Sequence, residues 1–235
     1  MEVVSCGPID LVALGKAHGC VVVGIHVKVK DLDIRASEML ETISNTSWIN
    51  DFGAVKKISF EARAKRTIQK LVELIVTRSD TELTTDFGEY LISDSAQCVL
   101  NLNCNHLKVP LAELLKEKVS GNPGFDFHTE SYGNFIAFGE AKYSGSINPY
   151  TKALQQIIDF ISLEKDSAEL DLLENFVSAG AITNYLAGHK AYVAAFSINS
   201  REPEKIISSA VSHALTDSLL AYKELYIIGV EIDAK

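Results

Sequence analysis

Two kinds of hydrophobic pattern alternate along the chain, one typical of strands and one of helices. A β-branched run from Val21 to Val29 predicts a strand. Between residues 60 and 77, apolar side chains recur at helical spacing and predict an amphipathic helix. The same patterns predict helices at 81–91, 111–119, 149–163 and 203–224, a mostly helical stretch at 170–186, and strands at 124–129, 134–143, 190–198 and 225–232. Residues 31–50 are polar and mixed, which predicts a short helix and a loop.

Turn signals organise the middle of the chain. Gly121-Asn122-Pro123-Gly124 is a strong turn sequence, and Tyr132-Gly133-Asn134 separates two apolar segments that we expect to pair as a hairpin. Alternating helices and strands around a central hairpin predict an α/β protein with a mixed central β-sheet flanked by helices. We expect residues 1–60 to form an N-terminal, strand-containing segment packed on the core, and residues 61–235 to form the main domain.

Composition places the chain among ordinary globular proteins. It has 235 residues, of which 47% are hydrophobic and 23% charged. Its apolar runs are shorter than the roughly 18 residues that a membrane span needs. Residues 1–9 lack the basic-then-apolar pattern of a signal peptide. We therefore expect a cytoplasmic protein without a membrane partner.

The four cysteines do not follow a metal or disulfide pattern. Cys6, Cys20, Cys98 and Cys104 form no Cys-x-x-Cys pair, and no histidine lies at zinc-finger spacing from them. We expect small core or surface residues, in keeping with the general burial of free cysteine.

The net charge of −9 argues against a protein that holds DNA by itself, because phosphate binding normally uses an excess of Lys and Arg. A nuclease could still have this charge in two ways: a metal site accounts for some of the acidic residues, or a partner supplies most of the nucleic-acid binding. The second is favoured, because one metal site explains only a few charges. The predicted helix at 60–77 carries Arg63, Lys65, Arg66 and Lys70, which suit a solvated helix face or a contact with phosphates or a partner.

The candidate chemistry lies in Gly124-Phe125-Asp126-Phe127-His128 and in Glu140-Ala141-Lys142. Side chains two apart on a strand share a face, so Glu140 and Lys142 project together, and hairpin pairing can bring Asp126 beside Glu140. Two carboxylates suit Mg²⁺ (or Mn²⁺), which would polarise a phosphate and activate water. Lys142 would orient that water or stabilise developing charge. The alternative is an exposed strand end with an ordinary Glu–Lys pair.

Asp126, Glu140 and Lys142, in a hairpin followed by a helix, resemble the PD-(D/E)XK nuclease superfamily. Three motifs together resemble the HamA-like family, which includes the nuclease subunit of the Hachiman anti-phage defence system. They are Phe87-Gly88-Glu89-Tyr90-Leu91, Gly124-Phe125-Asp126-Phe127-His128 and Phe138-Gly139-Glu140-Ala141-Lys142-Tyr143. The resemblance runs from about residue 60 to the end, and implies a PD-(D/E)XK restriction-endonuclease-like core over residues 61–235.

The resemblance also implies partners and further site residues. It implies an effector DNase that works beside a large helicase subunit. It also implies that Glu89 is a third acidic metal ligand; the alternative is a carboxylate on a helix face that pairs with a basic side chain. His128 shares a face with Asp126, so it either contacts substrate or water or is a satisfied core histidine. Gln156 is a possible substrate contact, although the Gln-x-x-x-Tyr pattern of some branches is not matched, because Asp159 or Phe160 stands at the fourth position.

Two other functions are compatible with these residues. A stand-alone restriction- or repair-type endonuclease would need a basic DNA-binding surface, which the net charge disfavours. A non-catalytic adaptor with a nuclease fold would have no physical reason to keep a buried trio of charges. We also expect a partner to restrain the nuclease, because unrestrained cleavage without sequence preference would be toxic.

Overall fold

The computed structural model describes residues 1–16, 19–77, 83–115 and 124–233. One mixed sheet of seven strands runs through this part of the chain. The strands are β1 (Glu2–Pro8), β2 (Val21–Val29), β3 (Leu107–Lys108), β4 (Phe127–Glu130), β5 (Ile136–Lys142), β6 (Ala191–Ile198) and β7 (Glu224–Ile232). Their spatial order is β1-β2-β7-β6-β5-β4-β3.

The centre of the sheet is parallel and its margins are antiparallel. The four central strands, β2, β7, β6 and β5, run parallel to one another. At one margin β1 pairs antiparallel with β2; at the other, β4 pairs antiparallel with β5, and β3 with β4. All eight residues of β6 are buried, as expected for a central strand that is covered on both faces. The mixed sheet and the β4–β5 hairpin confirm the architecture predicted from the sequence.

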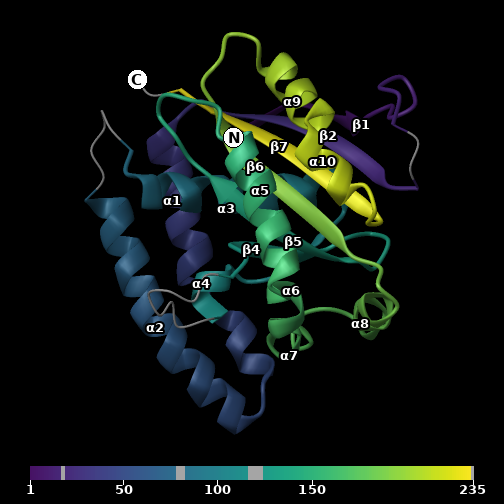
Figure 1. The fold of residues 1–235 in the computed structure, drawn as a ribbon. Helices are drawn as coiled ribbons and strands as arrows, with labels where there is room; N and C mark the ends of the chain where they lie inside the picture. Colours follow the sequence, from purple (N-terminus) through teal and green to yellow (C-terminus); the bar gives the residue numbers. More distant parts are fainter. Residues whose placement is uncertain (17–18, 78–82, 116–123, 234–235) are drawn as a thin grey trace.

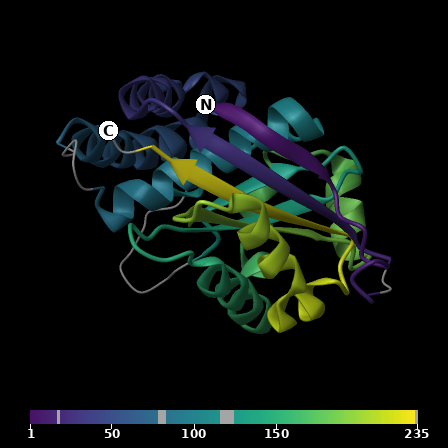
Figure 2. The ribbon, with the colours of Figure 1, turned by 90° about the horizontal axis from the view of Figure 1, so that it is seen from above.

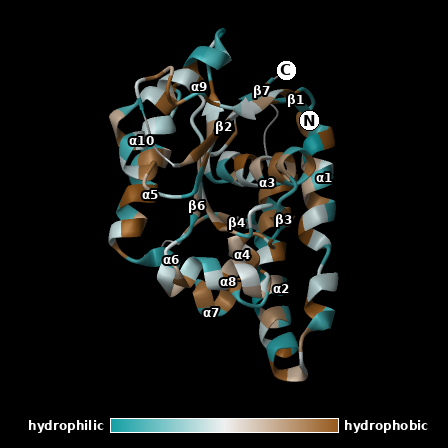
Figure 3. Cartoon of the chain, turned by 90° about the vertical axis from the view of Figure 1, so that its right-hand side faces the viewer, coloured by the Kyte–Doolittle hydropathy of each residue, from teal (hydrophilic) through white to brown (hydrophobic). Residues whose placement is uncertain are grey.

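Helices cover both faces of the sheet (Figures 1 and 2). They are α1 (Leu32–Ser44), α2 (Ala54–Val76), α3 (Thr85–Cys104), α4 (Ala112–Leu115), α5 (Tyr150–Ser162), α6 (Lys165–Ala168), α7 (Leu170–Leu173), α8 (Ala179–Leu186), α9 (Pro203–Ser212), α10 (Ala214–Leu219) and the 3₁₀ turn η1 (Ser47–Asp51). Seen near its edge, the sheet has α5 and α10 on one side and α3 and α1 on the other (Figure 3).

Each face of the sheet has its own apolar core. Phe138, Tyr192 and Phe196 pack on the α5 side, while Val193 and Ala195 pack on the α3 side. Because side chains alternate along a strand, β5 and β6 contribute to both cores at once. The two helices that flank the hairpin are thereby fixed against opposite faces of β5, the strand that carries Glu140 and Lys142.

The prediction of one long helix over 203–224 was wrong. The chain breaks at His213, whose backbone is extended (φ −65°, ψ 144°), so that α9 ends at Ser212 and α10 begins at Ala214. The His213 Nδ1 accepts the Leu215 N–H at 3.2 Å and thereby caps α10. Residues 170–186 are mostly helical, as predicted, but in two pieces: α7 ends at Leu173 and α8 begins at Ala179, after its cap Ser178, whose Oγ accepts the Ala181 N–H.

Helix α3 and strand β1 also differ from the sequence prediction. The helix expected at 81–91 continues to Cys104, and Thr84 caps it by accepting the Phe87 N–H at 3.3 Å. Strand β1 was not predicted at all; it extends the sheet by one antiparallel edge. Residues 81–82, the end of the helix expected at 111–119 and the turn residues 121–123 lie outside the described part of the chain.

The N-terminal segment shares the sheet with the rest of the chain. It supplies β1 and β2, and the expected boundary at residue 60 falls within α2. Arg63 does not belong to the exposed basic face of α2, because its guanidinium lies 5.7 Å from the Phe60 ring centroid and donates to the Leu115 carbonyl. Lys65, Arg66 and Lys70 are exposed as expected. Among the described helices, none combines the length and apolar character needed to cross a membrane.

Candidate functional site: a buried carboxylate pair and a lysine

Asp126 and Glu140 meet where the β4–β5 hairpin ends. The register pairs Phe127 with Gly139, so the next position along places Asp126 opposite Glu140. Backbone hydrogen bonds hold Asp126 there, since its N–H donates to the Gly139 carbonyl at 2.9 Å and its Oδ2 accepts the Ala141 N–H at 2.9 Å. The Asp126 carboxylate is thereby fixed by the same strand that carries Glu140.

Lys142 connects acids from two different elements. Its Nζ lies 2.6 Å from Glu140 Oε1 on β5 and 3.5 Å from Glu89 Oε1 on α3. The Glu140 side chain is completely buried, Lys142 is 15% exposed and Glu89 is 29% exposed. The structure thus brings together all four residues expected at the catalytic centre. Solvent exposure increases from the buried Glu140 through Lys142 to Glu89.

Of the atoms in the site, the second oxygen of Glu140 has the greatest need of a proton or a cation. Oε2 is buried and receives no hydrogen bond from the described residues. Burial raises the pKa of Glu140 well above its ordinary value, and the nearby Asp126 carboxylate raises it further, while Lys142 acts in the opposite direction. A proton on Glu140 would hydrogen-bond to Asp126. The two carboxylates therefore favour a proton or a cation between them.

Lys142 remains positively charged in this environment. Burial by itself lowers the pKa of its ammonium group, but the carboxylates of Glu140, Asp126 and Glu89 together raise it above the ordinary lysine value. Lys142 therefore suits the binding of an anion or the stabilisation of negative charge, and does not suit the role of a general base near neutral pH.

Two residues of the site, Asp126 and Glu140, are suited to hold a metal ion. Asp126 and Glu140 offer adjacent carboxylates, and Glu140 Oε2 is a buried oxygen without a donor. Mg²⁺ is often held by only one or two carboxylates and keeps several waters. Over the ranges that the structure describes, no group of three or more His, Cys, Asp or Glu side chains is arranged to hold a metal. Glu89 contacts Lys142 and does not complete a three-carboxylate group.

Two glycines let α3 and β4 approach β5 closely at this site. A Cβ at Gly88 would lie 2.2 Å from Cγ of Tyr143, and a Cβ at Gly139 would lie 2.3 Å from the Phe127 ring. Each glycine precedes an acid of the site, Glu89 and Glu140 respectively. Close packing of the Tyr143 ring on Gly88 therefore sets how near Glu89 comes to Lys142, a role that the sequence alone did not reveal.

We expect Gly88→Ala to lower the free energy of unfolding by about 1–3 kcal/mol, because the added methyl group collides with a ring and helix backbone cannot yield as a side chain can. Adding Tyr143→Ala should leave the further cost of the glycine change close to zero, because the colliding ring is gone. Denaturant unfolding of the single and double variants measures this coupling; equal costs of Gly88→Ala in both backgrounds would contradict it.

His128 is a buried partner of Glu169. Its side chain is fully buried, and its Nε2 lies 2.6 Å from Glu169 Oε2. The other oxygen of Glu169 accepts the Phe125 N–H at 3.2 Å. Of the two roles expected for His128, its burial and its Nε2 contact favour the core histidine, although its buried Nδ1 receives no hydrogen bond from the described residues. Glu169 was missed at the sequence level because it lies in a helical stretch about forty residues away, with no local motif.

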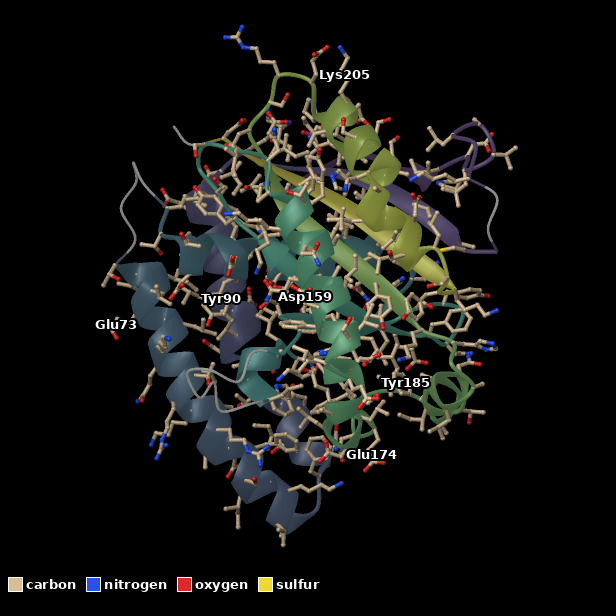
Figure 4. The ribbon with its side chains drawn as sticks, in the orientation of Figure 1. Glu73, Tyr90, Asp159, Glu174, Tyr185 and Lys205 are labelled. Atoms are coloured by element: carbon tan, nitrogen blue, oxygen red, sulfur yellow. The ribbon has the colours of Figure 1, made fainter. Side chains whose placement is uncertain are left out.

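An open groove joins Lys142 to helix α5. Its volume is about 670 Å³, and α5 lines it with Lys152, Gln155 and Gln156. Figure 4 shows Asp159 of this wall, which accepts a hydrogen bond from Gln155 at 2.9 Å. Gln156 is half-buried and lines the same groove as Lys142, as required for a residue that contacts a substrate bound at the site.

The loop after β5 is tied to the end of β6 by Asn199. Its Nδ2 donates to the carbonyls of Ser144 (2.7 Å) and Ile147 (2.8 Å), and its backbone N–H donates to Asn148 Oδ1. These bonds fix the segment that connects Lys142 to helix α5. A lone Asn after a strand gives no signal of this role, which only the parallel pairing of β5 with β6 creates.

Comparison of the chain with protein-family models, curated proteins and solved structures found no match.

Proposed function

We propose that this protein is a metal-dependent DNA nuclease, the effector subunit of an anti-phage defence complex with a helicase partner, similar to the HamA-like proteins. The observation that carries the proposal is the Glu140 carboxylate, fully buried beside Asp126 with one oxygen lacking a donor and the other bound to Lys142. Such a group is costly to a fold unless a cation or proton offsets it, and strongly perturbed carboxyl groups cluster at functional sites.

Each side chain has a distinct part in this proposal. Asp126 and Glu140 would hold Mg²⁺ or Mn²⁺, with Glu89 at the margin of the same site. A bound metal supplies polarisation of the phosphate and a lowered pKa of its coordinated water. The Lys142 ammonium stabilises the negative charge that develops on the phosphate during hydrolysis. Gln156, on the wall of the groove, contacts the nucleic-acid backbone next to the scissile bond.

The order of elements around the site supports a PD-(D/E)XK core. Helix α3 is followed by the antiparallel strands β3, β4 and β5, then by α5 and by β6, which pairs parallel to β5. The acids lie on the hairpin and the lysine follows two residues after Glu140 on the same face. The resemblance to that superfamily rests on one part of this arrangement, the hairpin with Asp126, Glu140 and Lys142 that a helix follows.

The charge of the chain supports a partner. At −9 it gives little long-range attraction for DNA, so a helicase subunit supplies the grip and restrains the nuclease in this proposal. A cytoplasmic location would place the complex where phage DNA enters.

Cleavage of plasmid and linear DNA with Mg²⁺ or Mn²⁺ tests the proposal, with the chain assayed alone and with the co-expressed helicase. We expect metal-dependent cutting that EDTA stops and that Asp126→Asn lowers at least about 100-fold. Asp171→Asn, an exposed acid on α7, is the matched control and should leave cutting unchanged. Absence of cutting by both preparations, or equal cutting by Asp126→Asn, would contradict the proposal.

The raised pKa of Glu140 also predicts how stability depends on pH. Because the folded state binds this proton more tightly than the unfolded chain, the associated stability is complete below the ordinary value of 4.5 and is lost as pH rises through the folded pKa. Mg²⁺ should therefore stabilise the wild type more at pH 8 than at pH 5. Melting curves with and without Mg²⁺ measure this difference, and a pH-independent Mg²⁺ effect would contradict it.

A further inference from the structure

Two cysteines far apart in the sequence meet at the edge of the sheet. The Sγ atoms of Cys6, on β1, and Cys104, the last residue of α3, lie 3.9 Å apart. Cys6 is exposed and Cys104 is partly buried. Disulfide formation needs the two sulfur atoms to approach from this distance to about 2.05 Å. This contact lies outside the carboxylate site and is independent of the proposed nuclease activity.

A bulge in β1 aims Cys6 at α3. Val3 pairs with Val27 and Cys6 pairs with Ile25, and the register shifts between Val3 and Ser5. Since Val27 and Ile25 belong to the core on the α3 side, the extra residue turns Cys6 to that side. Ser5 correspondingly points to the other face, where its Oγ donates to Glu204 at 2.8 Å. Without the shift, strand alternation would direct Cys6 away from Cys104.

We propose that Cys6 and Cys104 are a thiol pair that a peroxide oxidises to a disulfide. The Cys6 sulfur attacks the peroxide oxygen and becomes a sulfenic acid, which releases one water. The Cys104 sulfur then attacks the Cys6 sulfur, and the hydroxyl leaves as a second water with the Cys104 proton. Two thiols and one hydrogen peroxide thus give one disulfide and two waters.

The surroundings assign the order of these steps. Cys6 is the exposed thiol, so it meets the oxidant first. Burial, followed by the nearby Cys6 and Glu224, raises the pKa of Cys104 to about 12, which keeps Cys104 a thiol until it resolves the sulfenic acid. The resulting bond would attach the edge strand to α3, the helix that carries Glu89.

Peptide mapping of the peroxide-treated protein under non-reducing conditions tests the proposal. Because Cys98 and Cys104 share one tryptic peptide, a Cys98→Ser variant is the matched control and should form the cross-link as the wild type does. Cys104→Ser should lose it. We expect the cross-linked wild type to melt about 5–15 °C higher than the reduced protein, since the bond closes a loop of about 100 residues.

Oxidation of Cys6 to sulfinic or sulfonic acid without a cross-linked peptide would overturn the proposal. So would a cross-link that persists in Cys104→Ser, because Cys6 would then pair with a different cysteine. Metal-dependent DNA cleavage should be present in Cys104→Ser, so that failure of this inference and failure of the proposed nuclease function give separate readouts.

Discussion

Glu140→Gln should abolish metal-dependent DNA cleavage and yet stabilise the fold. Glutamine has the shape of the protonated acid and cannot supply the charge that holds a metal, so we expect activity to fall at least about 100-fold. The same change removes a buried carboxylate whose Oε2 has no donor among the described residues, while Lys142 keeps a carboxylate partner in Glu89 at 3.5 Å. We expect the free energy of unfolding in metal-free buffer at pH 8 to rise by about 0.5–2 kcal/mol.

Denaturant unfolding in EDTA and a cleavage assay with Mg²⁺ measure the two effects on the same preparation. Asp171→Asn, an exposed neutralisation of one acid, is the control for the change in net charge. The stabilisation by Glu140→Gln should shrink as pH falls, because the wild-type acid then takes up its own proton. A variant that is both inactive and strongly destabilised would contradict the account, since it would make Glu140 a structural residue.

Lys142→Met should have the opposite effect on stability with a similar loss of activity. Methionine keeps much of the apolar stem and removes the cation that lies 2.6 Å from Glu140 and 3.5 Å from Glu89. We expect a loss of about 3 kcal/mol at pH 8, because removing one partner of a buried ion pair leaves the other charge uncompensated. Cleavage should fall about 100- to 1,000-fold, the usual cost of one stabilising group in the transition state.

Thermal unfolding at pH 5 and pH 8 separates charge from packing in this variant. Protonation of Glu140 at the lower pH relieves the uncompensated charge, so the destabilisation should be smaller there. Lys65→Met, an exposed lysine on α2, is the matched control and should change neither stability nor activity appreciably. A loss of stability that is equal at both pH values would show that Lys142 contributes packing alone.

The hairpin and its charged residues could be predicted because they depend on local patterns. Two paired strands follow from the alternation over 124–129, the apolar run that ends at Glu140 and the Gly-Asn turn between them. Glu140 and Lys142 share a face because they are two residues apart on one strand. The place of Glu89 followed from the resemblance to a family, and the structure brings it to Lys142.

The remaining features depend on tertiary contacts that leave little trace in the sequence. His213 interrupts a helical pattern without glycine or proline, by capping the next helix with its own ring. Glu169 reaches His128 from the junction of α6 and α7, about forty residues along the chain, and Gly88 is explained only by the Tyr143 ring that packs on it. The bulge that aims Cys6 at Cys104 belongs to β1, a strand that was not predicted, and it becomes visible only in the pairing of β1 with β2.

The central claim is tested most directly by cleavage assays that compare the wild type with Glu140→Gln on linear duplex DNA with Mg²⁺, in the presence of the proposed helicase partner. The account predicts cutting by the wild type that needs the metal, and cutting by Glu140→Gln that is at least about 100-fold slower although the variant is fully folded. Equal cutting by both proteins, or a wild type that leaves DNA intact, would contradict the assignment of Asp126, Glu140 and Lys142 as a nuclease centre.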